Sequence, residues 1–460
     1  MTDLASPPEP PFNPWRLLQL SSFQIGSAMG DILVTAIWNR IMIVNLGLPA
    51  WPIALLIALR YLLTPLSLWA GFRSDTRPLF GLRRTPYIWL GRGMMVAALP
   101  LLGLSLTSFV AAGTAAAEDT VGWLLALTFF VLYGSGSLLS GSPFLALARD
   151  SVPKSRQGFA VTILETALIV LFPIVAIVFS VWMHDFSLQV FWQLVMATAI
   201  IGGLFWFLAI LGVEKRAPVA AEAATASSDV AGPDFRATFG RIWADSRVRL
   251  FCAFLALATL AAWAQDAILE PFGAEVVAQN VGQTTRYSAY WQGATAVTLI
   301  AILLLWRRRA PERQKPVTRL GLGIMAAGMA ALAVAALLAQ PRLVTLALVV
   351  FGAGFGLYTF GGLSLMMVMT SDKAAGAFLG LWTITILLSR GAGIFLGGVL
   401  RDALLRSTGS AELSYGIIFG LEALGLLGAM WLLSRLNIEA FARDTGRVNP
   451  IEVQVAAAEM

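Results

Sequence analysis

The sequence is poor in the residues that build metal centres, disulfides and most active sites. Its 460 residues include one cysteine, Cys252, and one histidine, His184. A single cysteine excludes a disulfide framework, a zinc ribbon and an iron–sulfur cluster, and a single histidine excludes any site that needs two imidazoles. We find no Walker A sequence, no dinucleotide fingerprint and no credible Ser–His–Asp set. The sequence therefore predicts a protein that is not an enzyme and has no metal site.

Charged residues are also scarce. They make up 13% of the chain, against about a quarter in soluble proteins. Hydrophobic residues make up 58%, and the mean hydropathy is +0.77. A soluble domain cannot bury that much apolar surface, which excludes an ordinary water-soluble enzyme. The length alone would suggest about three soluble domains, but the hydropathy overrides that estimate.

Apolar runs long enough to cross a bilayer recur along the chain. A spanning helix needs about 20 predominantly apolar residues. We find twelve such runs, which are 17–43, 50–72, 87–107, 121–148, 158–182, 189–212, 249–271, 286–306, 320–339, 343–369, 374–400 and 413–436. We therefore expect an all-α membrane protein with twelve transmembrane helices in two pseudo-symmetric six-helix bundles.

Basic residues sort strongly to one side of this topology. Of the 32 lysines and arginines, 24 fall in segments on the side of the N-terminus, four fall inside spans and four fall on the opposite side. Those on the opposite side are Arg286, Arg342, Arg401 and Arg406. Because basic loops stay in the cytoplasm, this split predicts two cytoplasmic termini. It also explains the net charge of +6 without a nucleic acid, since these cations meet anionic lipid headgroups.

Composition divides the chain into five segments. The first 15 residues are rich in proline and lack the basic start and short apolar core of a cleavable signal peptide. Residues 217–233 are rich in alanine and serine, as in flexible linkers. The expected order is a cytoplasmic tail over 1–15, a six-helix bundle over 16–212, a cytoplasmic linker over 213–248, a second six-helix bundle over 249–436 and a cytoplasmic tail over 437–460.

The two halves of the sequence share a repeated pattern. Three glycines of the fourth span are matched 220 residues later on the tenth, and the pairs are Gly134 and Gly354, Gly136 and Gly356, and Gly141 and Gly361. Asp31 precedes an Asn-Leu-Gly turn, as Asp266 precedes an Asn-Val-Gly turn 235 residues later. Together with the six-plus-six division, these matches predict two parallel repeats related by an axis along the membrane normal.

Ionisable residues inside the expected spans are few and costly. A charge at the bilayer centre costs about 2.5–3.5 kcal/mol on insertion scales, so it usually faces the bundle interior and has a partner. The candidates for a cavity or ligand-binding site are Asp31, Arg40, Arg60, Glu165, Asp266 and Arg390. Weaker candidates, which we expect near span ends, are Arg92, Glu270 and Glu422. For each, two interpretations stay open: an ion pair that locks helices together, or a polar lining of a central cavity.

The spacing of the first two candidates limits how they can be satisfied. Asp31 and Arg40 lie about 13 Å apart along a helix that rises 1.5 Å per residue. They cannot pair directly, so each needs a partner on another span or a watery cavity.

Aromatic residues are abundant, with 15 tryptophans, 27 phenylalanines and 7 tyrosines. Five tryptophans fall well inside the expected spans: Trp38, Trp206, Trp263, Trp291 and Trp382. Packing or lipid contact explains such residues, but a flat hydrophobic ligand would also find stacking surfaces among them. If that ligand carried a central Mg²⁺, its axial ligand would be an oxygen rather than a buried histidine, because His184 falls in a loop.

The loop after the second span contains a recognisable pattern. Its glycines and charged residues are Gly71, Asp75, Arg77, Gly81, Arg83 and Arg84. This resembles the Gly…Asp-Arg…Gly-Arg-Arg loop of the major facilitator superfamily, with Thr76 inserted between the aspartate and the arginine. The resemblance implies the major facilitator fold and a gating or structural role for the loop.

Further stretches are more specific. They are Gln24-Ile25-Gly26, the run from Ile37 to Ile43, Leu48-Pro49-Ala50-Trp51, and the second-span loop continued through Thr85-Pro86-Tyr87-Ile88-Trp89. Here the chain resembles the bacteriochlorophyll delivery family of phototrophic bacteria, the PucC- and LhaA-type light-harvesting assembly proteins, and is most similar to the PucC type. The resemblance implies a factor of the intracytoplasmic membrane that delivers or shields bacteriochlorophyll as cargo for antenna polypeptides. The resemblance does not identify which residues of this chain would bind the pigment.

Two other functions stay open at this point. A proton-coupled transporter of a small solute would use Asp31, Glu165 and Asp266 as proton carriers, and Arg40, Arg60 or Arg390 to bind an anion. A pigment-free scaffold would gather antenna polypeptides alone. The partners we expect are bacteriochlorophyll or a late precursor, antenna polypeptides and membrane lipids, and no nucleic acid.

Overall fold

Each of the twelve apolar runs falls in a helical segment of the protein. The structure is a computed structural model that describes residues 12–76, 79, 81–153, 156–214, 240, 242–306, 315–370, 375–438 and 440–441. Among these residues, β structure is limited to one isolated bridge between Leu79 and Leu82. Backbone groups in a bilayer must be satisfied within the protein, and helices achieve this inside each segment.

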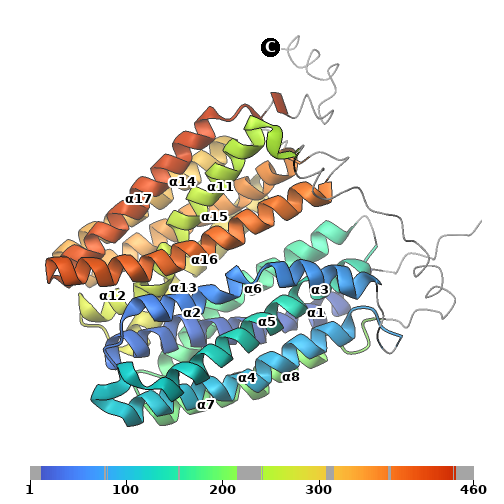
Figure 1. The fold of residues 1–460 in the computed structure, drawn as a ribbon. Helices are drawn as coiled ribbons and strands as arrows, with labels where there is room; N and C mark the ends of the chain where they lie inside the picture. The colour runs from blue at the N-terminus through green and yellow to red at the C-terminus, as the bar shows by residue number, and fades with distance from the viewer. Residues whose placement is uncertain are drawn as a thin grey trace, which may run out of the picture. The chain divides into compact units, whose positions relative to one another are not determined.

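The first six expected spans correspond to helices of the N-terminal half (Figure 1). These are α1 (Pro14–Ile32) with the π-helical η1 (Leu33–Trp38) and η2 (Ile41–Asn45), α2 (Ala50–Leu62) with α3 (Pro65–Thr76), α4 (Thr85–Ala112) with the short η3 (Gly113–Glu118), α5 (Thr120–Asp150), α6 (Gln157–Trp182), and α7 (Leu188–Ala197) with η5 (Thr198–Gly202) and α8 (Gly203–Leu208).

The other six correspond to helices of the C-terminal half. They are α11 (Ser246–Trp263) with η6 (Ala264–Ala267) and α12 (Leu269–Glu275), α13 (Val281–Trp306), α14 (Lys315–Leu338), α15 (Pro341–Val368), α16 (Ala375–Thr408) and α17 (Ala411–Arg435). Polar side chains fix several helix starts: Asn13, Ser187, Asp245 and Ser410 each accept a hydrogen bond from a backbone N–H of the first turn.

Eleven helical stretches of the described residues are long and apolar enough to cross a membrane. The remaining expected span is α13, which has 26 residues. Its length suffices for a crossing, but its first half carries Gln283, Arg286 and Gln292, which lower its hydropathy. The protein is therefore a multi-pass membrane protein.

The chain forms two compact units whose boundaries interleave. Unit 1 contains residues 1–48, 59–229 and 280–285, and unit 2 contains 49–58, 230–279 and 286–460. The start of α2 thus belongs with the C-terminal helices, and the start of α13 with the N-terminal ones. The first segment follows Asn45, Leu46 and Gly47, and the second begins with the matching Asn280, Val281 and Gly282.

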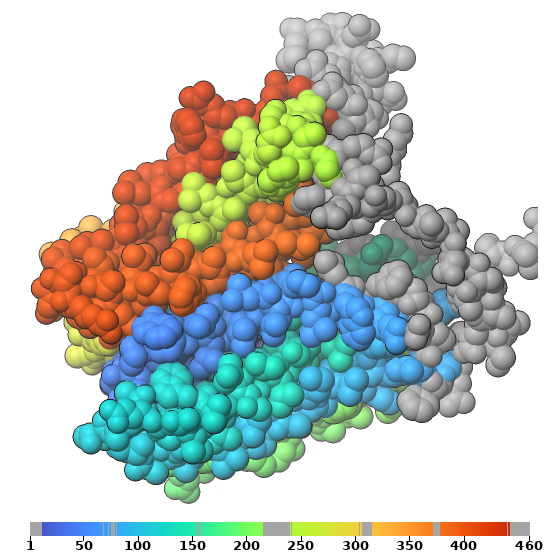
Figure 2. All heavy atoms as spheres, in the orientation of Figure 1, coloured from blue at the N-terminus to red at the C-terminus, as the bar shows by residue number. Residues whose placement is uncertain are grey.

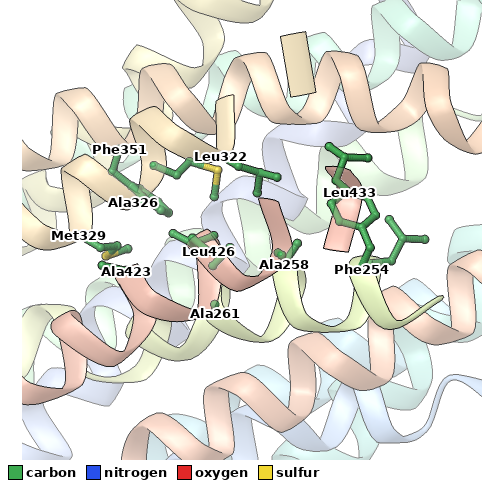
Figure 3. Packing of buried hydrophobic residues seen from close by; sticks show 14 of the residues in the cluster. Phe254, Ala258, Ala261, Leu322, Ala326, Met329, Phe351, Ala423, Leu426 and Leu433 are labelled. Atoms are coloured by element: carbon green, nitrogen blue, oxygen red, sulfur yellow. The ribbon is translucent and has the colours of Figure 1, made fainter. Parts of the chain in front are cut away.

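The core of unit 2 is a continuous apolar packing, and Figure 3 shows the part of it between α11, α14, α15 and α17. It includes Phe254, Ala258 and Ala261 of α11, Leu322, Ala326 and Met329 of α14, Phe351 of α15, and Ala423, Leu426 and Leu433 of α17. Small and large side chains alternate across these contacts, which lets the helices approach closely.

Close helix crossings in the two units are built alike. A Cβ on Gly136 would meet the carbonyl oxygen of Gly91 where α5 packs on α4 in unit 1. A Cβ on Gly354 would lie 2.8 Å from the carbonyl oxygen of Gly321 where α15 packs on α14 in unit 2. The equivalent glycines are therefore 218 residues apart, and the predicted offset of 220 is wrong here. The sequence misled because Gly352 continues the alternating glycines, so the offset of 218 matches two glycines while the offset of 220 matches three.

Large apolar side chains cover the outside of the helices. On α6, Ile174, Ile177 and Val181 are 50%, 52% and 69% exposed. In Figure 2, α16 forms a continuous orange band of side chains, and its exposed members include Leu379, Leu388 and Leu396. Water would penalise such surfaces, whereas acyl chains match them.

A matched pair of glycines tests the importance of the crossing in unit 1. A Cβ on Gly91 would meet Gly136 and Ser140, whereas a Cβ on Gly93 of the same helix would meet nothing within 4 Å. We expect Gly91→Val to destabilise the protein by about 1–3 kcal/mol, because it forces α4 and α5 apart. Gly93→Val should change the free energy of unfolding by only a small fraction of that amount. Thermal unfolding of both variants in detergent tests this, and equal stability of the two would contradict it.

Candidate functional site

The first span loses its regular α-helix next to Asp31. The α-helix ends at Ile32, and two π-helical segments follow over 33–38 and 41–45. A π-helical turn widens the helix and turns side chains out of the regular register, and such turns are frequent at functional sites. Asp31 therefore stands at a local break in the helix, inside a membrane-spanning segment.

Asp31 finds its partner on the second span. Its carboxylate forms an ion pair with Arg60 of α2, and the two side chains are 22% and 19% exposed. Arg60 also donates a hydrogen bond to the hydroxyl of Tyr61. The hydroxyl of Tyr133, on α5, fills the space beside Gly30. We call Asp31, Arg60, Tyr61 and Tyr133 the charge cluster of unit 1.

Two glycines make the charge cluster possible. A Cβ on Gly30 would collide with the hydroxyl of Tyr133, and a Cβ on Gly134 would lie 3.1 Å from the Cβ of Arg60. Gly30 thereby leaves room for the Tyr133 side chain beside α1, and Gly134 lets α5 pack closely on α2 at Arg60. The ion pair of Asp31 with Arg60 is the contact that the helix-locking interpretation requires. The cavity interpretation of these residues stays a prediction.

The other predicted residues of unit 1 lie elsewhere. Arg40 is 5% exposed and donates a hydrogen bond of 2.7 Å to Oδ1 of Asn45, within the same span. Glu165 of α6 is exposed and makes no hydrogen bond or ion pair with a described residue. The structure therefore unites Asp31 with Arg60 and leaves Arg40 and Glu165 outside the charge cluster.

Arg92, Glu270 and Glu422, which we expect near span ends, are all buried and do not reach the surface of the protein. They are 5%, 3% and 3% exposed. The guanidinium of Arg92 lies between the rings of Phe23 and Trp206, at 4.3 and 4.9 Å from their centroids. These contacts are cation–π interactions, which explain how a helix can bury an arginine inside unit 1. Hydropathy places span ends only to within a turn or two, so it could not separate these residues from interfacial ones.

The loop motif after the second span is held by acidic residues from later in unit 1. The backbone N–H groups of Arg83 and Thr85 each donate to the carboxylate of Glu214 at 2.7 Å. The side chain of Arg84 pairs with Asp150 at 2.7 Å.

The structure describes only some of the remaining motif residues. Gly81 has a positive φ of 75°, as a tight turn requires. Gly71 lies on α3, where a Cβ would be 3.5 Å from Ser142. The side chain of Asp75 and all of Arg77 lie outside the described residues.

In unit 2 the seventh span also breaks beside its aspartate. The α-helix α11 ends at Trp263, a 3-10 turn runs over 264–267, and α12 begins at Leu269. Asp266 lies in that turn and is half-buried. The sequence repeat between Asp31 and Asp266 thus has a structural counterpart, because a regular helix stops at each.

Beside this break, aromatic rings gather from three helices. Trp263 of α11, Trp291 of α13 and Phe355 of α15 have ring centroids 5.7–5.9 Å apart and meet edge to face. The guanidinium of Arg390, on α16, lies 3.3 Å from the ring centroid of Trp263. Phe351 and Tyr358 extend the group along α15. We call Trp263, Trp291, Phe351, Phe355 and Tyr358 the aromatic cluster of unit 2.

The aromatic cluster and the charge cluster occupy equivalent positions in the repeat. At the offset of 218 fixed by the helix crossings, Tyr133 corresponds to Phe351 and Gly134 to Gly352. Gly134 packs against Arg60 of the second span, whereas Gly352 packs against Trp291 of the eighth. One scaffold position therefore carries ions in unit 1 and rings in unit 2.

The tryptophans predicted inside the spans divide into two groups. Trp38, Trp206 and Trp382 are fully buried, and Trp291 is 5% exposed, as expected for packing residues. Trp263 is the half-buried exception.

A buried ionic network in unit 2 escaped the sequence analysis. Arg401 forms ion pairs with Glu275 and with Asp402, and Tyr415 donates a hydrogen bond of 2.8 Å to Glu275. Asp402 also accepts a hydrogen bond of 2.9 Å from the backbone N–H of Trp51. Because α16 continues to Thr408, eight residues beyond the expected end of its span, Arg401 is 8% exposed rather than a loop residue.

Metal binding has no support in the described part of the chain. No group of three or more histidine, cysteine, aspartate and glutamate side chains there could hold a metal ion. His184 lies in the turn after α6 with its imidazole beside Asp185.

Comparison with known proteins shows the family. The family profile described as PUCC protein matches residues 37–441. Protein PucC of Rhodovulum sulfidophilum is 32% identical, over 84% of this chain and 85% of that protein. Protein PucC of Rhodobacter capsulatus is 28% identical over 90% of both chains. A protein of Rhodobacter capsulatus named bacteriochlorophyll synthase 44.5 kDa chain is 27% identical, over 89% of this chain and 92% of that protein.

Solved structures show the fold. A transporter of the POT family in complex with a thioalcohol-conjugated peptide has a TM-score of 0.66 at 14% identity, covering 92% of this chain and 96% of that one. A nucleoside transporter has a TM-score of 0.62 at 13% identity, covering 92% and 99%. The chain therefore has the major facilitator fold, as its loop motif predicted.

The ion pair of the charge cluster can be tested by a double-mutant cycle. Asp31→Asn leaves Arg60 without its carboxylate partner. Breaking a fully buried pair costs about 3–5 kcal/mol, and partial exposure reduces this to about 1–3 kcal/mol. Unfolding of Asp31→Asn, Arg60→Gln and the double variant should give a coupling energy of at least about 1 kcal/mol.

Arg40→Gln supplies the control for this cycle, because Arg40 bonds to Asn45. Combined with Asp31→Asn, it should be additive. Additive behaviour of Asp31→Asn with Arg60→Gln would contradict the pair.

Proposed function

The chain belongs to the PUCC protein family, and we propose that it is an assembly factor for the bacterial light-harvesting antenna. It delivers or shields bacteriochlorophyll while that pigment is inserted into antenna polypeptides. The observation that carries the proposal is the family match over residues 37–441, together with relatives named PucC. The name of a further relative, bacteriochlorophyll synthase 44.5 kDa chain, supports the link to this pigment.

The physical properties of the protein suit this task. A bacteriochlorophyll combines a flat conjugated ring with a long apolar tail, so it stays in the bilayer and needs a carrier there. Exposed leucine, isoleucine and valine side chains on the helices provide an apolar outer surface for lipid and for antenna helices. The aromatic cluster supplies rings at membrane depth. Binding and release suffice for this role, and no catalytic turnover is required.

The proposed location follows from the same role. Antenna complexes assemble in the inner and intracytoplasmic membrane, so the protein acts there as a multi-pass component with both termini in the cytoplasm. The sorting of 24 basic residues to one side supports this orientation.

A proton-coupled transporter of a small solute is the second candidate. Glu165 favours it, because its carboxylate is exposed on an otherwise apolar membrane-spanning helix. Such a residue is costly unless it meets water or a substrate. Purified protein in vesicles should then couple solute entry to proton flux, and Glu165→Gln should abolish the coupling.

Deletion of the gene in a phototrophic bacterium tests the leading proposal. We expect antenna absorbance to fall while antenna transcripts persist, because pigment no longer reaches the polypeptides. Absorption spectra of membranes and transcript levels measure the two effects. A plasmid copy of the wild-type gene provides the control and should restore absorbance. Normal antenna levels in the deletion strain would contradict the proposal.

Mild-detergent purification from pigmented cells separates the remaining possibilities. Pigment and antenna polypeptides together in the purified fraction would support delivery. Antenna polypeptides without pigment would instead favour a scaffold.

A further inference from the structure

The aromatic cluster of unit 2 is only partly enclosed. Trp263, at the end of α11, and Phe355 and Tyr358, in the middle of α15, are half-buried. Other large rings of the same unit, such as Trp382 and Phe251, are fully buried. Part of each half-buried ring is therefore uncovered by this chain and available to a ligand.

The three rings meet edge to face, so each contact covers at most one face of one ring, and Arg390 lies over one face of Trp263. Trp263 meets Phe355 at an interplanar angle of 90°, and Trp291 meets both rings at about 80°. Rings that meet edge to face build a corner, whereas stacked rings would hide each other's faces. A corner of this kind offers both a face for stacking and an edge for contact to a planar guest.

One polar group borders the corner, and a second lies on the helix face that carries Trp291. The guanidinium of Arg390 lies 3.3 Å from the centroid of Trp263, and its side chain is half-buried. Tyr287 lies one helical turn before Trp291 on α13, so both occupy the same face of that helix. The hydroxyl of Tyr287 is buried and has no hydrogen-bond partner among the described residues. An unsatisfied buried hydroxyl is costly, and a ligand carbonyl would satisfy it.

The repeat supplies an independent argument. The equivalent position in unit 1 holds the ion pair of Asp31 and Arg60, which satisfies itself and repels an apolar guest. The position in unit 2 instead combines half-buried rings with the hydroxyl of Tyr287, which has no hydrogen-bond partner among the described residues. The two halves therefore differ in chemistry where their backbones agree.

We propose that the aromatic cluster of unit 2, with Arg390 and Tyr287, binds the conjugated macrocycle of the pigment. This assignment rests on the proposed function and locates its cargo site. Phe355 and Trp263 contact the ring, Arg390 donates a hydrogen bond to a carbonyl oxygen at the ring edge, and Tyr287 donates another. The apolar tail of the pigment stays in the acyl chains.

Binding of bacteriochlorophyll a to the full-length protein in nanodiscs tests the assignment. The double variant Trp263→Leu with Phe355→Leu should bind about tenfold more weakly than wild type, because it removes two ring contacts. The matched control is Trp431→Leu with Arg435→Gln. That pair also places a guanidinium over a tryptophan, at 4.9 Å, but belongs to no aromatic cluster. The control should bind like wild type.

A second measurement does not depend on removing aromatic packing. Resonance Raman spectra of the bound pigment report hydrogen bonds to its ring carbonyls. Arg390→Gln should shift one carbonyl band toward the free frequency, and Tyr287→Phe should shift another. Unchanged bands in both variants would overturn the assigned contacts.

The outcomes separate the two proposals. Wild-type affinity in the double variant Trp263→Leu with Phe355→Leu would overturn this site and leave the assembly function standing. A wild-type protein that binds no bacteriochlorophyll a would overturn the pigment role and this site together.

Discussion

The cost of holding charge inside an apolar bundle governs this structure. With 13% charged residues, the chain places few ions in its spans, and most of them are met by a partner within the same unit. Asp31 meets Arg60, Arg401 meets Glu275 and Asp402, and Arg92 meets the faces of two aromatic rings. All of these contacts except that of Arg401 with its neighbour Asp402 join different helices, so the scarce ions help to specify which helices pack together.

Glycines allow the close helix packing that these contacts require. Gly134 lets α5 pack closely on α2 at Arg60 in unit 1, and Gly352 does the same for α15 at Trp291 in unit 2. The two units thus carry different chemistry at equivalent positions. The first position holds an ion pair at a break in α1. The second lies beside the turn that contains Asp266 and holds aromatic rings.

Hydropathy alone predicted the architecture well, because the number and order of spans depend on apolar runs that need no tertiary information. The pairing of Asp31 with Arg60 could not be derived, since the two residues are 29 positions apart and only packing brings them together. Arg401 was assigned to a loop because basic residues usually end a span, and burial beside Glu275 overrode that tendency. The repeat was visible in sequence, but alternating glycines left its register ambiguous until the crossings of α14 and α15 fixed it.

Light-driven oxidation of the intact protein tests the central claim most directly, because a bound pigment generates singlet oxygen beside its own contacts. Wild-type protein loaded with bacteriochlorophyll a is illuminated in nanodiscs, and oxidised residues are located by mass spectrometry. Trp431, which is 56% exposed, serves as the internal reference for simple accessibility. The account predicts that Trp263 and Tyr358 are oxidised before Trp431. Oxidation that follows exposure alone, with Trp431 first, would contradict it.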